Sequence, residues 1–185
     1  MSRLRTEGEV ASSQAMPDVE ALFREYHPRV YAYVRYRIAS VAEAEDLTSD
    51  VLERALAHLA SYDARKGAFS TWLFRIAHNT WVNHLKQRQR RNPHHVALGE
   101  ELEDLVANEP TPEQAVLHKE ETAQLLKSLG TLPYRQQEIL SLRFAGRLTN
   151  REIARVLKMN ERTVSVTILR ALRKLRQQLV GSDIQ

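Results

Sequence analysis

Arginine side chains recur near the end of the sequence at a spacing that suits binding to duplex DNA. In a helix over residues 160–180 they would lie on one outward face. Guanidinium groups near the start and middle of such a helix can reach phosphates or guanine edges in a major groove, and apolar side chains can contact thymine methyls. A plain solvated surface is the alternative interpretation. The face consists of Arg162, Ser165, Val166, Leu169, Arg170 and Arg173.

A second set of residues places carboxylates along one side of an earlier helix. Asp46, Asp50 and Glu53 are spaced i, i+4 and i+7, with Ser49 beside them. This spacing gives one helix side a negative charge, which suits an arginine-rich partner. The pattern also fits a merely solvated acidic face, so the residues alone leave both interpretations open.

A third set combines basic and amide side chains on one face of the helix that follows the loop SYDARKG. Basic grooves with aromatic stacking platforms hold single-stranded nucleic acid, and Tyr62 lies in the loop. Trp72 falls on the apolar side of the helix and is assigned to the core, whereas the position of Trp81 stays open. The polar face holds Arg75, Asn79, Asn83 and Lys86.

The first set needs a helix-turn-helix to position it. Thr149 and Glu152 have capping-box spacing and start a short helix, and Asn160 can cap the long helix that follows. Lys158 stands where the turn between such helices usually has glycine. We predict the helix-turn-helix over residues 149–170. The apolar face of its second helix would hold Val164, Ile168, Ala171, Leu172, Leu175 and Leu179.

Helical periodicity also dominates the rest of the chain. Pro28 lies inside the first pattern, so a helix either starts or kinks there. Ser70 can cap the helix that ends before Asn92, and Thr111 opens a capping box after the linker. A further helix opens at Pro133 and stops at Gly146. No segment alternates as a strand does, so we predict an all-α fold. One helix, with the acidic face, has an apolar stripe of Leu47, Val51, Leu52, Ala55, Leu56 and Leu59.

Charge divides the chain into domains. The net charge is +4 and the pI about 9.5, but residues 75–91 contain no Asp or Glu, residues 100–121 are strongly acidic, and the chain is basic again from residue 143. We predict a frayed segment over 1–17, helical domains over 18–92 and 112–180, and a flexible acidic linker over 93–111. The absence of cysteine, of an apolar signal core and of any run of about 20 apolar residues favours a cytoplasmic protein with no membrane insertion.

Enzymatic chemistry finds little support in the sequence. It lacks the HExxH, G-x-S-x-G and phosphate-cradling glycine motifs, and it has no cysteine. The seven histidines include His78, His84 and the pair His94 and His95, but none has convincing ligand spacing. We predict no catalytic residue, no metal and no cofactor.

Two blocks of sequence resemble one known family. YHPRVYAYVRYRI, AEDLTSDVLERALAHLASYD and GAFSTWLFRIAHNTWVNHLKQRQR look like the first conserved domain of bacterial RNA polymerase sigma factors. LGTLPYRQQEILSLRFAGRLTNREIARVLKMNERTV resembles the second conserved domain of the extracytoplasmic-function group. The resemblance covers about residues 21–179, and two blocks in the family's order are more specific than a lone helix-turn-helix.

The resemblance implies a role and partners. The acidic face of Asp46, Ser49, Asp50 and Glu53 would dock on the β′ coiled coil of core RNA polymerase, which also contributes its β subunit. The polar face with Tyr62 would melt the minus-ten element, and the residue 162–173 face would read the minus-thirty-five duplex of promoter DNA. The acidic linker would thread toward the polymerase cleft, and an anti-sigma factor would hold the protein inactive.

Two other functions remain as alternatives. A chain that mimics a sigma factor could titrate an anti-sigma factor without binding DNA, but the basic face near the C-terminus argues against it. A free-standing helix-turn-helix repressor would need neither the acidic face nor the SYDARKGAFSTWLFRIAHN block.

Overall fold

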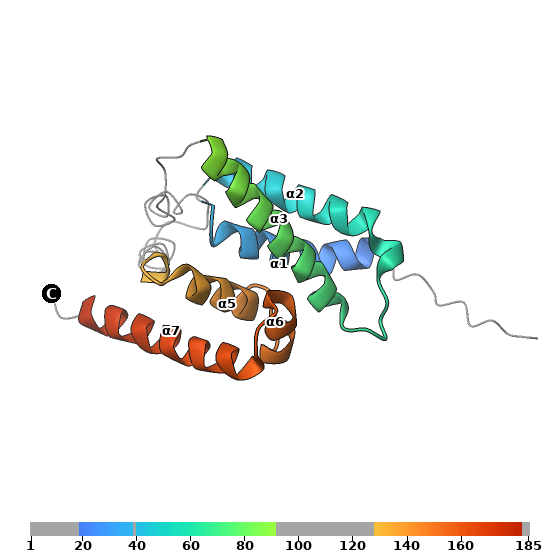
Figure 1. Cartoon of the computed structure of the whole chain (residues 1–185). Helices are drawn as coiled ribbons and strands as arrows, with labels where there is room; N and C mark the ends of the chain where they lie inside the picture. The colour runs from blue at the N-terminus through green and yellow to red at the C-terminus, as the bar shows by residue number, and fades with distance from the viewer. Residues whose placement is uncertain (1–18, 39, 92–127, 183–185) are drawn as a thin grey trace, which may run out of the picture.

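The computed structural model describes residues 19–38, 40–91 and 128–182, and within these ranges all regular structure is helical. This confirms the predicted all-α fold (Figure 1). The predicted frayed segment and the acidic linker lie outside the described residues. The elements are α1 (Val19–Arg35), α2 (Val41–Ala57), the short 3-10 helix η1 (Leu59–Ser61), α3 (Phe69–Arg91), α5 (Tyr134–Phe144), α6 (Asn150–Leu157) and α7 (Glu161–Ser182).

Helices α1, α2 and α3 form the first half of the molecule. Pro28 lies inside α1, which continues through it. The Ser40 hydroxyl caps α2 by accepting a hydrogen bond from the Glu43 amide at 3.3 Å. The predicted apolar stripe of α2 is buried at Leu47, Val51, Leu52 and Ala55, but Leu56 is half exposed at the helix end. Amphipathic periodicity thus sets which face of α2 meets the core.

The predicted start of α3 is wrong by about two residues. The helix begins at Phe69, and the Trp72 amide already bonds the carbonyl of Ala68 at 3.2 Å, so Ser70 lies inside the first turn and does not cap it. Its hydroxyl instead donates to Glu152 at 3.2 Å, in the other half of the molecule. A contact between distant segments has replaced the local cap that the sequence predicted.

Helices α5, α6 and α7 form the second half. Pro133 precedes the first residue of α5 as predicted, and the helix gives way to a turn after Phe144. A Cβ atom at Gly146 would lie 2.6 Å from the Leu142 carbonyl oxygen and 3.2 Å from the Phe74 ring. Only glycine allows the end of α5 to approach α3 this closely.

The two halves share one hydrophobic core. In Figure 1, α5 and α6 lie against the layer formed by α1 and α3, and α7 runs along the outside of α5. Tyr33 of α1 and Phe74 of α3 meet edge to face, with ring centroids 5.6 Å apart. Buried residues of the second half complete the same cluster, including Ile139, Leu142, Leu148, Ile153 and Val164.

Candidate nucleic-acid interface

The predicted helix-turn-helix is present, and its turns are built as the sequence indicates. The Thr149 hydroxyl accepts a hydrogen bond from the Glu152 amide at 3.3 Å, while the Glu152 carboxylate accepts one from the Thr149 amide at 2.8 Å. Lys158 takes the left-handed conformation at φ 52° and ψ 49°. The Asn160 side chain then accepts from the Arg162 amide at 2.8 Å and caps α7. These contacts set the angle between α6 and α7.

The outward face of α7 remains accessible. Arg162, Arg170 and Arg173 are exposed, and the apolar members Val166 and Leu169 are 39% and 62% exposed. In residues 128–182, eleven Lys and Arg stand against three Glu, so this half carries a strongly positive charge. Such a surface attracts a polyanion, and its ridge of arginines has the length of a few base pairs.

Ser165 differs from the other members of this face. It is half-buried, accepts a hydrogen bond from the Asn150 amide group at 2.9 Å and donates to the Glu161 carbonyl at 3.1 Å. These bonds join α6 to α7. Ser165 therefore fixes the helix pair in addition to its predicted place in readout.

The inward face of α7 follows the prediction with one exception. Val164 and Ala171 are fully buried and Leu175 is 6% exposed, whereas Leu172 is 41% exposed. Leu172 instead lines an open groove together with Phe144. The prediction that Leu172 belongs to the core is wrong, because α5 covers only part of the stripe.

The polar face of α3 is exposed along its length. Arg75, Asn79, Asn83 and Lys86 all reach solvent. Tyr62 is half-buried, its ring packs edge to face on Phe69 with centroids 5.3 Å apart, and its hydroxyl donates to the Gly67 carbonyl at 3.3 Å. The ring therefore braces the loop before α3.

The two tryptophans differ in exposure. Trp81 is 1% exposed and belongs to the core, while Trp72 is half-buried in an aromatic group with Tyr62 and Phe69. The indole nitrogen of Trp81 donates to the Tyr134 hydroxyl at 3.2 Å, across the boundary between the halves. The sequence left open whether Trp81 lies in the core or on the surface, and its burial places it in the core.

The carboxylates of α2 form a ridge on the side away from the core. Asp46, Ser49 and Glu53 are exposed, and Asp50 is partly exposed. Asp50 pairs with Arg54 at 2.6 Å, and both side chains remain 40% or more exposed. An exposed pair of this kind contributes only about 0–1 kcal/mol, so its carboxylate can change partners at little cost.

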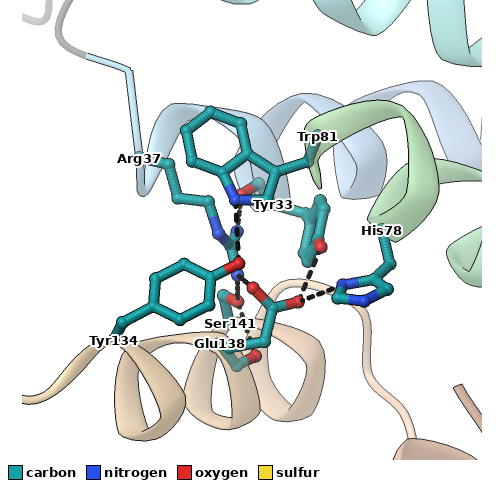
Figure 2. Close-up of polar contacts among 7 residues, drawn as sticks. All are labelled: Tyr33, Arg37, His78, Trp81, Tyr134, Glu138 and Ser141. Atoms are coloured by element: carbon teal, nitrogen blue, oxygen red, sulfur yellow. Dashed lines mark hydrogen bonds and ion pairs between the residues drawn. The ribbon is translucent and has the colours of Figure 1, made fainter. Parts of the chain in front are cut away.

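A buried polar network, which the sequence analysis did not predict, joins the halves. The Glu138 carboxylate of α5 lies in the centre of Figure 2 and is 0% exposed. It accepts from the Tyr33 hydroxyl at 2.8 Å and from Arg37 at 3.0 Å, and His78 Nδ1 lies 3.1 Å away. Arg37 also donates to the Ser141 hydroxyl and to the Tyr33 carbonyl.

The charges of this network stabilise one another. Burial alone would raise the pKa of Glu138, but the Arg37 guanidinium and the hydrogen bonds from His78 and Tyr33 lower it to about 2. Burial lowers the pKa of Arg37, yet the adjacent Glu138 carboxylate outweighs this effect and raises it. Burial and the nearby Glu138 raise the pKa of Tyr134 to about 12. Glu138 and Arg37 are therefore both charged at neutral pH.

The residues that the structure describes were also compared with the requirements for a metal site and for a membrane-spanning helix. In residues 19–38, 40–91 and 128–182, no three His, Asp or Glu side chains gather closely enough to hold a metal ion. None of the helices described there combines the length and the apolar character needed to cross a membrane.

Comparison with known proteins agrees with the division into two regions. The family model for sigma-70 region 2 matches residues 22–91, and the model for sigma-70 region 4 matches residues 122–175. The fold resembles that of the sigma factor RpoE in its complex with the anti-sigma factor NepR from Bartonella quintana. The TM-score is 0.71 at 21% identity, over 88% of this chain and 96% of that one.

Curated relatives are sigma factors as well. The ECF RNA polymerase sigma factor BldN of Streptomyces coelicolor is 37% identical over 158 residues, and the match spans 85% of this chain but only 59% of BldN. RNA polymerase sigma factor YlaC of Bacillus subtilis is 29% identical over 164 residues, which span 89% of this chain and 93% of YlaC. Both region models in the family's order, together with these relatives, show that the chain belongs to the extracytoplasmic-function group of bacterial RNA polymerase sigma factors.

Proposed function

We propose that this sigma factor binds core RNA polymerase and directs it to promoters by reading the minus-thirty-five duplex and opening the minus-ten element. The observation that carries the proposal is the presence of both sigma regions in one chain, in the family's order. The exposed arginines of α7, the polar face of α3 and the carboxylate ridge of α2 support it, because each leaves charged groups free for a partner.

The recognition helix suits duplex readout by its length and charge. Arg162 and Arg170 lie two turns apart on the exposed face of α7, with Val166 between them. We assign base and phosphate contacts to Arg162, Ser165, Val166, Leu169, Arg170 and Arg173. The assignment predicts that DNA binding weakens steeply with salt.

We assign the binding of single-stranded minus-ten DNA to the first half of the molecule. The polar face of α3 offers two amide and two cationic side chains, and the Tyr62 loop lies at the beginning of the same helix. Bases that leave the duplex are held by such combinations of charge and aromatic surface. The residues assigned are Tyr62, Arg75, Asn79, Asn83 and Lys86.

We assign the carboxylate ridge to the contact with core polymerase. We also propose that an anti-sigma factor binds the protein and controls its activity. Asp46, Ser49, Asp50 and Glu53 would meet a basic partner, the β′ coiled coil, with further contacts to β. Solved structures with this fold include sigma factors bound to anti-sigma factors, such as RpoE with NepR and CnrH with CnrY. We extend that kind of partner to this chain.

Run-off transcription on genomic templates tests the proposal. Core polymerase is assayed with and without the protein, and new start sites should appear only when the protein is added. Replacing Asp46, Asp50 and Glu53 together with Asn or Gln should abolish these starts and the retention of core polymerase in a pull-down. A protein that creates no new start sites with active core enzyme would refute the proposed function.

A further inference from the structure

The turn between α5 and α6 contains an arginine with an unfavourable backbone conformation. Arg147 has φ 51°, in the left-handed region, where a Cβ atom is crowded. The turn is fixed by its neighbours, since Leu148 is fully buried and the Arg143 guanidinium donates to the Leu148 carbonyl at 3.0 Å. Glycine would adopt this conformation without strain, so the backbone alone does not explain why position 147 holds arginine.

The side chain of Arg147 does not offset this strain within the fold. It is exposed, and it forms no hydrogen bond or ion pair with any of residues 19–38, 40–91 and 128–182. The same holds for Arg151, the second residue of α6. Backbone strain persists mainly at functional sites, so the strain at Arg147 points to a function for its side chain.

The start of α6 lies beside the readout face of α7. Asn150, the first residue of α6, donates to the Ser165 hydroxyl of α7 at 2.9 Å. Arg147 and Arg151 precede and follow Asn150 in the chain, and we call them the flanking pair. Because three residues of chain span at most about 11 Å, both arginines lie close to this junction. The flanking pair and the readout face are therefore neighbouring parts of one surface.

The flanking pair gives the start of α6 an exposed positive charge. The one carboxylate of α6, Glu152, is held by hydrogen bonds from Thr149 of the cap and from Ser70 and Thr71 of α3. In a helix-turn-helix the second helix enters the major groove while the first crosses the DNA backbone. Guanidinium groups at the first helix then meet phosphate oxygens, to which they donate charge-assisted hydrogen bonds.

We propose that Arg147 and Arg151 bind phosphates of the DNA strand at the edge of the groove that α7 reads. The inference rests on the proposed function, because it adds duplex contacts beside the same reading surface. These contacts hold α7 in register without reading a base, whereas Arg162 and Arg170 lie on the reading face itself. The charge of Arg147 then serves DNA binding at the expense of backbone stability.

The salt dependence of duplex binding tests the flanking pair. Two labelled duplexes, one from upstream of a start site found by run-off transcription and one of mixed sequence, are titrated with the full-length protein, alone and with core polymerase. Arg147→Gln and Arg151→Gln should each make the slope of log K against log salt concentration shallower by about 0.9, which is a loss of about eightfold in affinity at about 0.1 M salt. Both duplexes should show the same loss, because phosphate contacts carry no sequence information.

Two cations toward the other end of α6 serve as matched controls. Lys158 has the same strained conformation, with φ 52°, and the Arg155 guanidinium lies 3.7 Å from the position that a Cβ atom would take on Gly67, in the first half. Lys158→Gln and Arg155→Gln remove the same charge but should leave the salt slope unchanged. Arg147→Lys keeps the charge at position 147 and should keep the slope.

A glycine variant separates DNA binding from folding. Arg147→Gly removes the charge and the strain together, so duplex affinity should fall by about eightfold at about 0.1 M salt while the melting temperature stays the same or rises. A purely structural role for the side chain would lower the melting temperature and leave the salt slope unchanged, and that result would overturn the inference.

The outcomes separate this inference from the proposed function. If both glutamine variants keep the unmodified slope, or if the control variants lose as much, the inference fails although the sigma-factor role stands. A loss of core polymerase in a pull-down with unchanged duplex binding would mean that the flanking pair meets an acidic protein surface, which also overturns it. So would an absence of duplex binding by the unmodified protein, alone and with core polymerase. If the unmodified chain gives no new start sites while the slopes on the mixed-sequence duplex change as expected, the proposed function fails and the phosphate contacts stand.

Discussion

Arg37, in the turn that follows α1, and Arg170, in α7, are the same residue type, and the fold uses them in opposite ways. Arg37 is buried, donates to three acceptors and lies 4.0 Å from the centre of the Tyr33 ring. Arg170 is exposed in the middle of α7. An arginine therefore contributes to folding where its donors are satisfied within the chain, and remains available to a partner where they are not.

Removing the buried arginine should have the largest effect on stability. Arg37→Met leaves the Glu138 carboxylate buried without a counter-ion, so we expect a loss of about 3–5 kcal/mol. Urea unfolding followed by circular dichroism measures it. Arg24→Met breaks an exposed pair with Glu20 and should cost at most about 1 kcal/mol.

A double substitution tests whether the loss of stability comes from the unpaired buried charge. Arg37→Met combined with Glu138→Leu removes both charges and should recover most of the loss, because a buried ion pair and an apolar pair of similar volume are nearly equal in stability. If Arg37→Met costs no more than Arg24→Met, the contrast between buried and exposed arginine would be lost.

Acid should have the next largest effect, because it weakens the buried polar network around Glu138. The pKa of Glu138 is about 2 in the packed protein, whereas an exposed Glu titrates near 4.3. The groups facing it are Tyr33 of α1, Arg37 of the turn after α1, His78 of α3 and Tyr134 of α5. Because the pKa of Glu138 is depressed in the packed protein, the stabilisation from its carboxylate is complete above about pH 4.3. This stabilisation is lost as the pH falls toward 2.

The expected size of the acid effect is about 3 kcal/mol at most. Unfolding free energies measured between pH 2 and 7 should fall more steeply for the unmodified protein than for Glu138→Gln, which has no carboxyl group to titrate at this position. Identical slopes would mean that Glu138 does not carry the acid sensitivity. In alkali, the Tyr134 pKa of about 12 predicts a further loss between about pH 10 and 12, since the packed state holds the neutral phenol.

Removing the exposed arginine should affect DNA and leave the fold unchanged. Arg170→Ala is expected to weaken use of a duplex promoter by about 1–3 kcal/mol if the side chain reads a base. Its unfolding free energy should change by less than about 0.5 kcal/mol. Arg176→Ala, an exposed arginine nearer the end of α7, is the control, and promoter titrations give both values. Unchanged promoter preference would remove Arg170 from the readout set.

The sequence predicted those parts of the structure that depend on neighbouring residues. The capping box at Thr149, the cap at Asn160 and the left-handed residue at Lys158 follow from local hydrogen bonding and backbone sterics, and all three are present. The helical faces follow from a period of 3.6 residues. Local rules therefore sufficed for the helix-turn-helix.

The buried polar network around Glu138 could not be predicted, because it depends on which helices meet. Arg37 lies between Tyr36 and Ile38, and Glu138 lies before Ile139; nothing in these stretches distinguishes a buried charge from a surface one. Ser70 shows the same limit, since its hydroxyl bonds a residue 82 positions away. One clue was present in Gly146, whose place at the end of α5 allows the halves to approach.

Lys158 is a third cationic residue to set beside Arg37 and Arg170, and its backbone conformation lowers the stability of the fold. Its φ of 52° disfavours a side chain with a Cβ atom by about 1 kcal/mol. Lys158→Gly relieves this strain but gives the unfolded chain more freedom, so the net gain should stay below about 1 kcal/mol. Lys158→Asn tolerates the conformation with less added freedom and should stabilise at least as much. Arg147, at φ 51°, offers the matched pair Arg147→Gly and Arg147→Asn, and thermal melts compare all four. If both asparagine variants were destabilised, backbone strain would not govern these turns, and the lysine and arginine would have to contribute through their side chains, as Arg37 does.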